Sequence, residues 1–353
     1  MSPDTEILFE RRGAAGIVTL NRPKALNAVT HGMVRALATK LGEWARDQAV
    51  TRVIITAAGD RAFSAGGDIR ALHDLGRARR HGEALQFWRD EYMLNTLIKR
   101  YPKPYVALID GIVMGGGVGI SIHGSHRVVG DRFQFAMPEV GIGFFPDVGA
   151  TWFLPRLPGE VGTYVALTGE RLRNADAVPL GIATHYVASS RFPEILDALT
   201  GTAPVYATLE SFAEKLGVGA LVAYRKAIDQ LFRDDNVEDI LAALNRESVS
   251  RGSPAAGWAG ATAAAMRGKS PTSLKIALAQ VRRGKDWSFT ECMKAEFRIV
   301  SRIIRGHDFY EGVRAVIIDK DNQPRWKPDR LGQVLPLDID GYFAPLDQEL
   351  ELP

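Results

Sequence analysis

Residues 137–149 read MPEVGIGFFPDVG and place two carboxylates, Glu139 and Asp147, among apolar residues, glycines and prolines. An ionised carboxylate loses favourable hydration in apolar surroundings, so it seldom occurs there without a partner or a chemical task. A second unusual run, MGGGVG, lies upstream at residues 114–119. Such glycines leave backbone N–H groups uncovered, and N–H donors together with carboxylates indicate acyl chemistry on a polarised carbonyl group.

Around these two runs, short apolar segments alternate with helical patterns. We expect strands at residues 7–9, 16–20, 52–56, 105–109, 127–129 and 133–136. Thr30 is placed to cap a helix whose apolar positions follow at helical spacing, namely Met33, Leu37, Leu41 and Trp44. Residues 113–123 are expected to form one helix of small residues packed tightly against a sheet. The recurring order of strand, strand and helix predicts an α/β fold.

After residue 200 the pattern becomes helical. We expect helices at residues 208–216, 221–232, 237–245 and 271–281. Gly217 is placed to end the first of these helices. Ser288 and Glu291 fit a capping box that opens a further helix. We therefore divide the chain into a core at residues 1–200 and a helical C-terminal part at residues 201–353 that covers the site or mediates assembly.

The composition is that of an ordinary globular protein. Of 353 residues, 46% are hydrophobic and 24% are charged, and the net charge of +3 is too small to indicate nucleic acid as a partner. Cys292 is the only cysteine, so no internal disulfide can form and a reducing compartment is expected. We recognise no signal peptide, organelle leader or membrane-spanning run, which predicts a cytoplasmic protein without a membrane partner.

Two glycine-rich loops each follow an expected strand. FSAGGD occupies residues 63–68, where Asp68 is placed to cap a helix that begins at Ile69, and residues 115–117 are all glycine. Backbone N–H groups from two such loops can converge on one oxygen and form an oxyanion hole. The alternative is that these glycines serve turns and close packing only. A phosphate loop is disfavoured because no dinucleotide fingerprint accompanies the glycines.

The runs at residues 63–68, 111–119 and 138–149 resemble the signature of the crotonase superfamily of enoyl-CoA hydratases and isomerases. This resemblance implies a crotonase-like spiral of strand–strand–helix turns that holds an acyl-CoA thioester. Coenzyme A is then part of the substrate, and no metal or redox cofactor is implied. The oxyanion-hole donors would be Gly67 and Gly116. The implied substrate contacts are Glu91, Lys24, Ala25, Leu26, Ala65, Asp68, Ile69 and Asn95.

Within the superfamily, the chain is most similar to the 3-hydroxyisobutyryl-CoA hydrolase branch. The likeness lies in EYMLN at residues 91–95, KPYVALI at 103–109, GHDF at 306–309 and PRWKP at 324–328. It implies hydrolysis of that thioester in valine breakdown, with Glu139 and Asp147 in catalysis and Glu91 at the hydroxyl end of the substrate. Two departures from the hydratase pattern agree with this. Gly119 stands where two-base hydratases carry one Glu, and Asp147 stands where they tend to have Gly.

Thioester hydrolysis requires attack on the carbonyl carbon while its oxygen becomes negative. Glu139 can act as a general base on water, or as a nucleophile that passes through a mixed anhydride. Asp147 can orient the water, or protonate the leaving thiolate if its pKa is raised by a neighbouring carboxylate. The sequence leaves both routes open. It also leaves simpler interpretations, namely turn residues for Glu139 and Asp147 and a solvated helix residue for Glu91.

The remaining polar residues give weaker indications. His123 and His126 are expected on one helical face without a third ligand, so no metal site is expected. The basic run at residues 77–81 is expected to be a solvated helix face. The candidates for holding the CoA 3′-phosphate are Arg77, Arg79, Arg80, His81, Lys285, Lys294 and Arg298.

Two rival functions remain at this point. An enoyl-CoA hydratase or isomerase is the nearer rival, because an isomerase needs only one carboxylate and Gly119 does not exclude it. An RNA-binding protein of the same fold is the remoter rival, and the nearly balanced charge argues against it. A homo-oligomer is compatible with the sequence.

Overall fold

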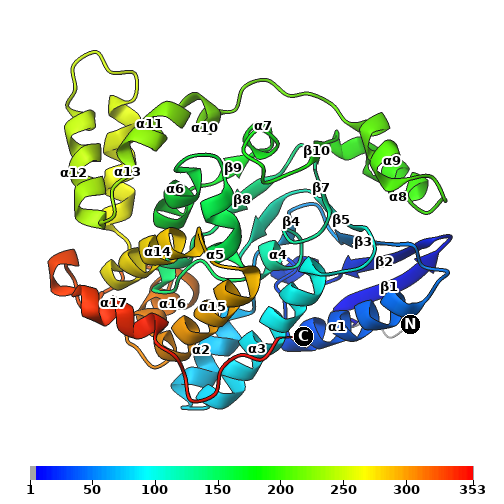
Figure 1. The fold of residues 1–353 in the computed structure, drawn as a ribbon, viewed down its shortest axis with the longest axis horizontal. Coiled ribbons are helices and arrows are strands. Elements are labelled where there is room, and N and C mark those ends of the chain that lie inside the picture. The colour runs from blue at the N-terminus through cyan, green and yellow to red at the C-terminus, as the bar shows by residue number, and fades with distance from the viewer. Residues whose placement is uncertain (1–4, 353) are drawn as a thin grey trace.

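The structure of the chain, a computed structural model, describes residues 5–352 and contains two β-sheets flanked by helices (Figure 1). The larger sheet has the strand order β1-β2-β3-β5-β7-β10, and the smaller has the order β4-β6-β8-β9. The strands of the larger sheet are β1 Ile7–Arg12, β2 Ala15–Leu20, β3 Arg52–Ala57, β5 Tyr105–Ile109, β7 His126–Val129 and β10 His185–Tyr186. Those of the smaller sheet are β4 Ala62–Ser64, β6 Ile112–Met114, β8 Gln134–Ala136 and β9 Leu172–Arg173.

The chain alternates between the two sheets as it advances. β3, β5 and β7 run parallel in the larger sheet, and each is followed by β4, β6 or β8 in the smaller one. A helical segment comes after each of these pairs. This is the strand–strand–helix order predicted from the sequence, and the α/β class is confirmed.

The helices of the first half are α1 His31–Arg46, α2 Ile69–Arg77, α3 His81–Lys99, α4 Gly116–Gly119, α5 Ala150–Phe153, α6 Val161–Thr168, α7 Asn174–Ala177 and α8 Phe192–Ala198. Those of the second half are α9 Val205–Phe212, α10 Ala220–Ala223, α11 Arg225–Leu231, α12 Val237–Ser248, α13 Ala256–Arg267, α14 Pro271–Gly284, α15 Phe289–Ile303, α16 Asp308–Val313 and α17 Pro336–Phe343. Short 3-10 turns at Pro23–Ala25 (η1) and Glu139–Ile142 (η2) and a π-helical turn at Arg314–Ile318 (η5) also bear on the site.

Three predicted helix caps are confirmed. The Thr30 side chain accepts a hydrogen bond from the Met33 N–H at the start of α1. Asp68 accepts one from Ala71 at the start of α2. Ser288 and Glu291 form a reciprocal capping box at the start of α15. Each cap satisfies N–H groups that have no acceptor within their own helix.

The expected helix at residues 113–123 is wrong in its extent. Val113 belongs to β6, which pairs with β4 and β8, and the helix that follows is the single turn α4. Sheet pairing therefore takes the first residues of the expected helix. His126 consequently lies in β7, not on a helical face with His123.

Two other expected helices also differ. The helix expected at 208–216 is α9, which starts earlier and ends at Phe212 rather than at Gly217. It ends because the chain turns to donate the Glu214 N–H to Tyr186 O beside β10. The helix expected at 221–232 is split at Tyr224 into α10 and α11, where the Tyr224 ring stacks on Trp258.

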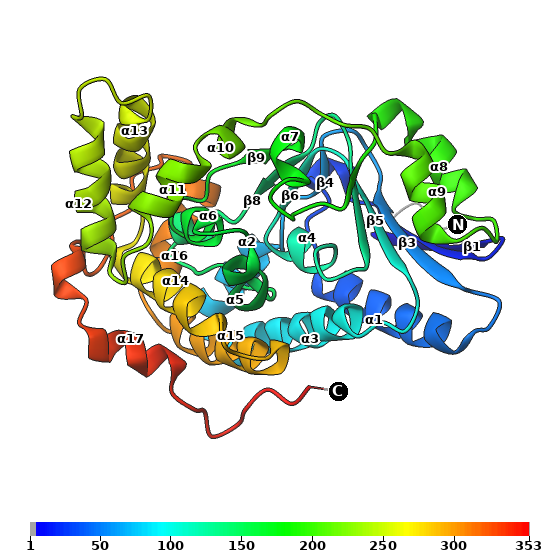
Figure 2. The same cartoon turned by 45° about the horizontal axis from the view of Figure 1, so that its top comes forward.

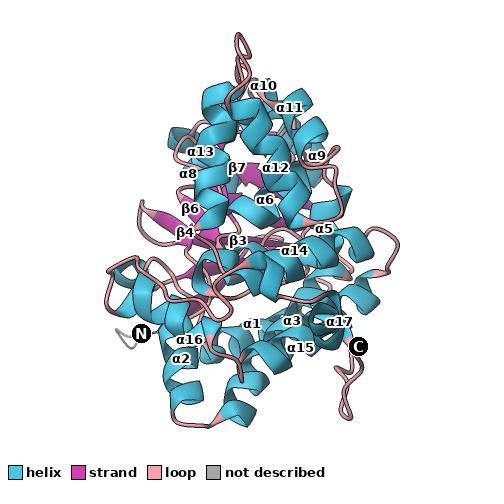
Figure 3. Cartoon of the chain, turned by 90° about the vertical axis from the view of Figure 1, so that its left-hand side faces the viewer, coloured by secondary structure: helices cyan, strands magenta, loops and turns pink. Residues whose placement is uncertain are grey.

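One large apolar cluster joins the two halves of the chain. It includes Phe63, Trp88 and Phe145 from the first half and Leu274 and Phe297 from the second. In Figure 2, α1, α3 and α15 lie side by side beneath the sheets. Figure 3 looks from the side of α12 and α13 and shows the strands behind the helices of the second half. The second half thus closes over the core rather than standing apart from it.

A smaller apolar cluster lies on the opposite face of the larger sheet. There α8 and α9 cover side chains such as Ile54 and Val106. Among the described residues, no helix combines the length and apolar character that crossing a membrane requires.

Candidate active site

A cavity of about 600 Å³ lies between the glycine loops and the second half of the chain. The glycine loops, four carboxyl side chains (Asp68, Glu91, Glu139 and Asp147) and a group of apolar side chains line it. The second half contributes Lys269, Val316, Ile317 and Asn322. We refer to this space as the cavity.

The two glycine loops lie against each other at the cavity wall. A β-carbon added at Gly116 would lie 3.1 Å from the Gly67 nitrogen. Gly66 and Gly115 have φ values of +112° and +46°, in the region that residues with side chains rarely adopt. Among the described residues, neither the Gly67 nor the Gly116 N–H has a protein acceptor. Two free donors therefore lie side by side, the arrangement that an oxyanion hole requires.

Glu139 enters the cavity from the turn that follows β8. It is the first residue of η2, its exposed fraction is 6%, and its Oε2 has no hydrogen-bond partner within the described chain. Burial raises the pKa of Glu139 well above its usual range, and the charge of Asp147 raises it further. A surface-turn role does not account for a buried and unpartnered carboxyl group.

Asp147 lies in the loop between η2 and α5 and lines the same cavity. Its exposed fraction is 4%, and the Tyr92 hydroxyl donates a hydrogen bond of 2.9 Å to Asp147 Oδ2. Burial raises the pKa of Asp147 to about 7, although the bond from Tyr92 acts in the opposite direction. Asp147 is therefore a buried acid and not a solvated turn residue.

Glu91 reaches the cavity from α3. Its exposed fraction is 2%, and its Oε1 has no partner in the described part of the chain. Burial raises the pKa of Glu91 well above its usual range, followed by the charges of Asp147 and Glu296. The interpretation of Glu91 as a solvated helix residue is wrong, because its position on α3 points it inward beside Trp88 and not to solvent.

Positive charge is scarce at the cavity wall. Arg70 and Lys269 are the basic residues among its described lining, and Arg70 donates a hydrogen bond to Ile317 O at 3.1 Å. Burial lowers the pKa of Lys269, although the charge of Glu170 acts in the opposite direction. With little neutralising charge nearby, burial favours the protonated forms of Glu91, Glu139 and Asp147.

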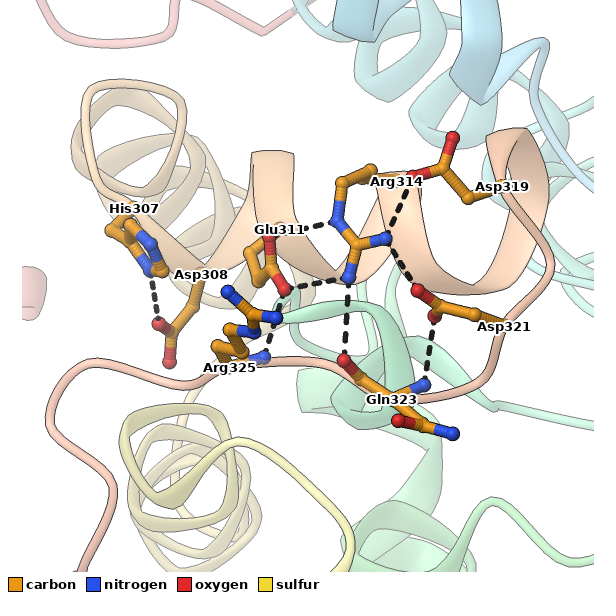
Figure 4. A network of polar contacts seen from close by, with 8 residues as sticks. All are labelled: His307, Asp308, Glu311, Arg314, Asp319, Asp321, Gln323 and Arg325. Atoms are coloured by element: carbon orange, nitrogen blue, oxygen red, sulfur yellow. Dashed lines mark hydrogen bonds and ion pairs between the residues drawn. The ribbon is translucent and has the colours of Figure 1, made fainter.

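The roof of the cavity is residues 314–322, which we call the roof segment. Arg314 holds this segment through hydrogen bonds to Glu311 at 2.8 and 3.0 Å and to Asp319 and Asp321 at 2.7 Å each (Figure 4). Its guanidinium also donates to Gln323 O at 3.3 Å. The roof segment thereby presents Val316, Ile317 and Asn322 to the cavity.

Gly119 has no room for a side chain. A β-carbon there would lie 2.7 Å from Val148 Cβ and 2.8 Å from Asn95 Nδ2. Contacts this short do not occur between real side chains, so a Glu at this position would require the loop at Val148 to move. The space that a second hydratase carboxylate would need is filled by the loop that carries Asp147.

The predicted substrate contacts divide into two groups. Leu26, Ala65, Asp68, Ile69 and Glu91 line the cavity. Lys24 and Ala25 are exposed on η1 outside the cavity lining, and Asn95 is buried beside Gly119. None of the basic candidates for a CoA phosphate lines the cavity. Of these, Arg80 pairs with Glu83 and Arg298 pairs with Glu349.

Several cavity residues were not identified from the sequence. Trp88 lies one turn before Glu91 on α3, and this spacing was a usable signal. Tyr92 lies outside the described cavity lining but donates its hydrogen bond to Asp147. Phe144 stacks on Trp88 with ring centroids 5.7 Å apart. No local sequence pattern indicated Lys269 or the roof segment as cavity residues, because only the packing of the second half brings them to the cavity.

His123 serves the active-site loop rather than a metal. Its Nε2–H donates a hydrogen bond of 2.7 Å to Val148 O, and burial lowers the pKa of His123 to about 3. Residues 5–352 contain no group of three or more His, Cys, Asp or Glu side chains placed to hold a metal ion.

Comparisons with known proteins agree with this architecture. A family model described as enoyl-CoA hydratase/isomerase matches residues 15–343. A protein of Danio rerio named "3-hydroxyisobutyryl-CoA hydrolase, mitochondrial" is 45% identical, covering 98% of this chain and 91% of its own. The Homo sapiens protein of the same name is 41% identical, covering 97% and 89%.

Two solved structures share the whole fold. The structure titled as a carnitinyl-CoA dehydratase from Mycobacterium thermoresistibile has a TM-score of 0.92 and 42% identity, covering 99% of both chains. The structure titled as an enoyl-CoA hydratase from Rhodobacter sphaeroides 2.4.1 has a TM-score of 0.90 and 38% identity, covering 99% of this chain and 100% of its own. The predicted crotonase-like architecture is thus confirmed.

Proposed function

The chain belongs to the enoyl-CoA hydratase/isomerase family, and from that premise we propose that it hydrolyses 3-hydroxyisobutyryl-CoA to 3-hydroxyisobutyrate and coenzyme A. Curated relatives that match nearly the whole chain carry the name of this hydrolase. The observation that carries the proposal is which carboxylates are present at the cavity and which are absent. Asp147 is present, and Gly119 leaves no space for the second carboxylate of a two-base hydratase.

The thioester oxygen would bind between the Gly67 and Gly116 N–H groups. These donors lie close together and have no acceptor among the described residues. They would stabilise the negative charge that develops on this oxygen as the carbonyl carbon is attacked. Losing one such donor typically costs roughly 2.7–4 kcal/mol of barrier stabilisation.

In the general-base route, Glu139 removes a proton from water while the water oxygen attacks the carbonyl carbon. The C–S bond then breaks, and Asp147 gives its proton to the leaving sulfur. The proton on Glu139 passes back to Asp147, so both carboxyl groups recover their starting states. Burial raises the pKa of Asp147 to about 7, which supports its role as a proton donor, and burial also raises the pKa of Glu139.

In the alternative route, Glu139 attacks the carbonyl carbon itself and forms a mixed anhydride, which water then hydrolyses. Single-turnover hydrolysis in heavy-oxygen water separates the two routes. The anhydride route can place one heavy oxygen in the Glu139 carboxyl group, whereas the general-base route places it only in the released acid. Mass spectrometry of the peptide that contains Glu139 reads the outcome.

The acyl group would extend from the oxyanion site toward Glu91. A buried carboxyl group without a partner is suited to hydrogen-bond a substrate hydroxyl group. Trp88 and Phe144 lie in the same cavity wall and would contact the methyl branch. Coenzyme A enters as part of the substrate in this proposal, and no resident cofactor is required.

The second candidate function is enoyl-CoA hydration or isomerisation. The titles of the two solved structures, a dehydratase and a hydratase, favour testing it. The deciding experiment assays thiol release from 3-hydroxyisobutyryl-CoA and hydration of a short enoyl-CoA, with the wild type and with Asp147→Asn. We expect thiol release by the wild type and its loss in the variant. Full enoyl-CoA turnover by the variant, without thiol release by either protein, would establish the rival.

Location and assembly remain proposals. The cytoplasmic placement inferred from the sequence contrasts with the curated relatives, whose names place them in mitochondria. A homo-oligomer likewise stays a prediction, and light scattering of the purified chain tests it directly.

A further inference from the structure

The loop that carries Asp147 is held by buried side chains from outside the loop. Gln280 on α14 donates a hydrogen bond to Pro146 O, and His123 donates one to Val148 O. The Gly149 N–H donates to Glu296 Oε2 at 2.8 Å, and the Thr151 N–H donates to Glu296 Oε1 at 2.9 Å. We call residues 146–151 the Asp147 loop.

Glu296 binds this loop through two hydrogen bonds, a pair of contacts that we call the grip. It lies on α15 with no exposed surface, and each of its two carboxylate oxygens accepts one backbone N–H of the loop. Burial raises the pKa of Glu296 to about 8, whereas the Gly149 and Thr151 N–H donors act in the opposite direction and favour the carboxylate, which offers only acceptors. The mechanism above assigns no role to this buried acid.

The backbone at Val148 and Gly149, where the first of these two hydrogen bonds is made, needs external support. Val148 has a φ of +53° and Gly149 a φ of +91°. A β-branched residue in the left-handed region is disfavoured and persists only where its surroundings enforce it. Glu296 holds the backbone immediately after Val148 by accepting the hydrogen bond from the Gly149 N–H. Tyr92 holds the Asp147 carboxyl group itself.

We propose that Glu296 is a positioning residue that fixes Asp147 in the cavity by holding the Gly149 and Thr151 N–H groups. The catalytic part of this inference rests on the hydrolase function proposed above. Its consequence is that α15 is part of the catalytic apparatus, although no atom of Glu296 lines the cavity.

The variant Glu296→Gln tests this with minimal change of shape. Its amide retains one acceptor but turns a donor toward the second loop N–H, which breaks one of the two bonds. We expect kcat for thioester hydrolysis to fall about 10- to 100-fold with little change in KM, because misplacement of a catalytic group by about 1 Å can cost about 100-fold. Ser301→Ala is the matched control, since Ser301 is also buried on α15 and its hydroxyl donates to Phe297 O within the same helix.

Introducing Glu296→Gln into the Asp147→Asn variant as well as into the wild type distinguishes a positioning role from general structural damage. If Glu296 acts through Asp147, Glu296→Gln should lower the residual activity of Asp147→Asn less than twofold. An equal loss in both backgrounds, or no loss in the wild-type background, overturns the proposal.

Amide hydrogen exchange gives a readout that does not depend on activity. We expect the Gly149 and Thr151 amides to lose protection in Glu296→Gln while amides of β3 and β5 keep theirs. Unchanged protection at Gly149 and Thr151 overturns the positioning role. Failure of the proposed hydrolase function is recognised separately, because the wild type would then release no thiol while the exchange result still stands.

Discussion

At the scale of single residues, burial is what converts ordinary carboxylates into usable acids and bases. Asp147 keeps its hydrogen bond from Tyr92, yet its pKa rises to about 7 because desolvation outweighs that bond. Burial likewise raises the pKa values of Glu139 and Glu91. The same residue types on the surface would be permanently ionised and of no use as proton donors at neutral pH.

A pH dependence of turnover follows from the proton-donor role that we propose for Asp147. A proton donor must be protonated, so we expect kcat to fall as pH rises through about 7, the pKa of Asp147. Asp147→Asn should lower kcat throughout and remove this falling limb. The measurement is kcat for thiol release between pH 5 and 9. A falling limb that survives unchanged in Asp147→Asn would assign it to another group.

Stability should depend on pH in a related way through Glu91. Its folded-state pKa lies above the unfolded value, so the folded state binds the proton more tightly and loses stability as pH rises above the unfolded pKa. We expect Glu91→Gln to be more stable than wild type at pH 9, by roughly 1–3 kcal/mol, with a smaller difference at pH 5. Urea unfolding at the two pH values tests this.

The matched control for that experiment is Glu83→Gln on the same helix. Glu83 is exposed, and Arg80 lowers its pKa, so the substitution removes a favourable charge and no gain is expected at pH 9. Equal gains for the two variants would show that the effect is unrelated to burial.

At the scale of elements, the glycine loops illustrate what local sequence does and does not determine. Residues 63–68 and 115–117 indicated two loops that follow strands, and the structure places both loops at the cavity. The predicted extent of the helix at residues 113–123 was wrong because the pairing of β6 depends on β4 and β8, which a local pattern does not reveal. Helix caps were predictable because their partners lie three residues away.

The close contact between the two loops makes Gly116 intolerant of a side chain. A β-carbon there would lie 2.6 Å from Glu91 Oε1 and 3.1 Å from the Gly67 nitrogen. We expect Gly116→Ala to lower kcat by at least about 100-fold, the usual effect of losing an oxyanion-hole donor. Steady-state kinetics of thiol release measures it.

Gly82→Ala is the control for this substitution. Gly82 lies in α3, and a β-carbon there meets nothing within 4 Å. We expect unchanged kinetics and slightly higher stability, since Ala favours a helix more than Gly. Normal kcat in Gly116→Ala would remove Gly116 from the oxyanion site.

At the scale of the whole molecule, the site is assembled from segments far apart in the sequence. The carboxylates could be predicted because family motifs surround Glu139 and Asp147. Glu296, Lys269 and the roof segment could not, since each reaches the site only through packing of the second half against the first. A long-range contact of this kind leaves no periodic or local mark on the chain.

The roof segment provides the last prediction, because it links the second half to substrate binding. Arg314 joins Glu311 to Asp319 and Asp321, and removing its side chain would free the residues that present Ile317 and Asn322 to the cavity. A substrate would then have to order the segment as it binds, at a cost of about 1.4 kcal/mol. We therefore expect Arg314→Ala to raise KM for the acyl-CoA roughly tenfold and to change kcat much less.

Two further variants make this result specific. Arg314→Lys keeps the charge but not the fork of donors, so its KM should lie between those of wild type and Arg314→Ala. Arg330→Ala is the control, because Arg330 is exposed and its contact with Asp329 is 4.0 Å long. A loss of kcat at unchanged KM in Arg314→Ala would mean that the segment acts on the chemical step, and the roof would then have to be regarded as part of the catalytic geometry rather than of substrate capture.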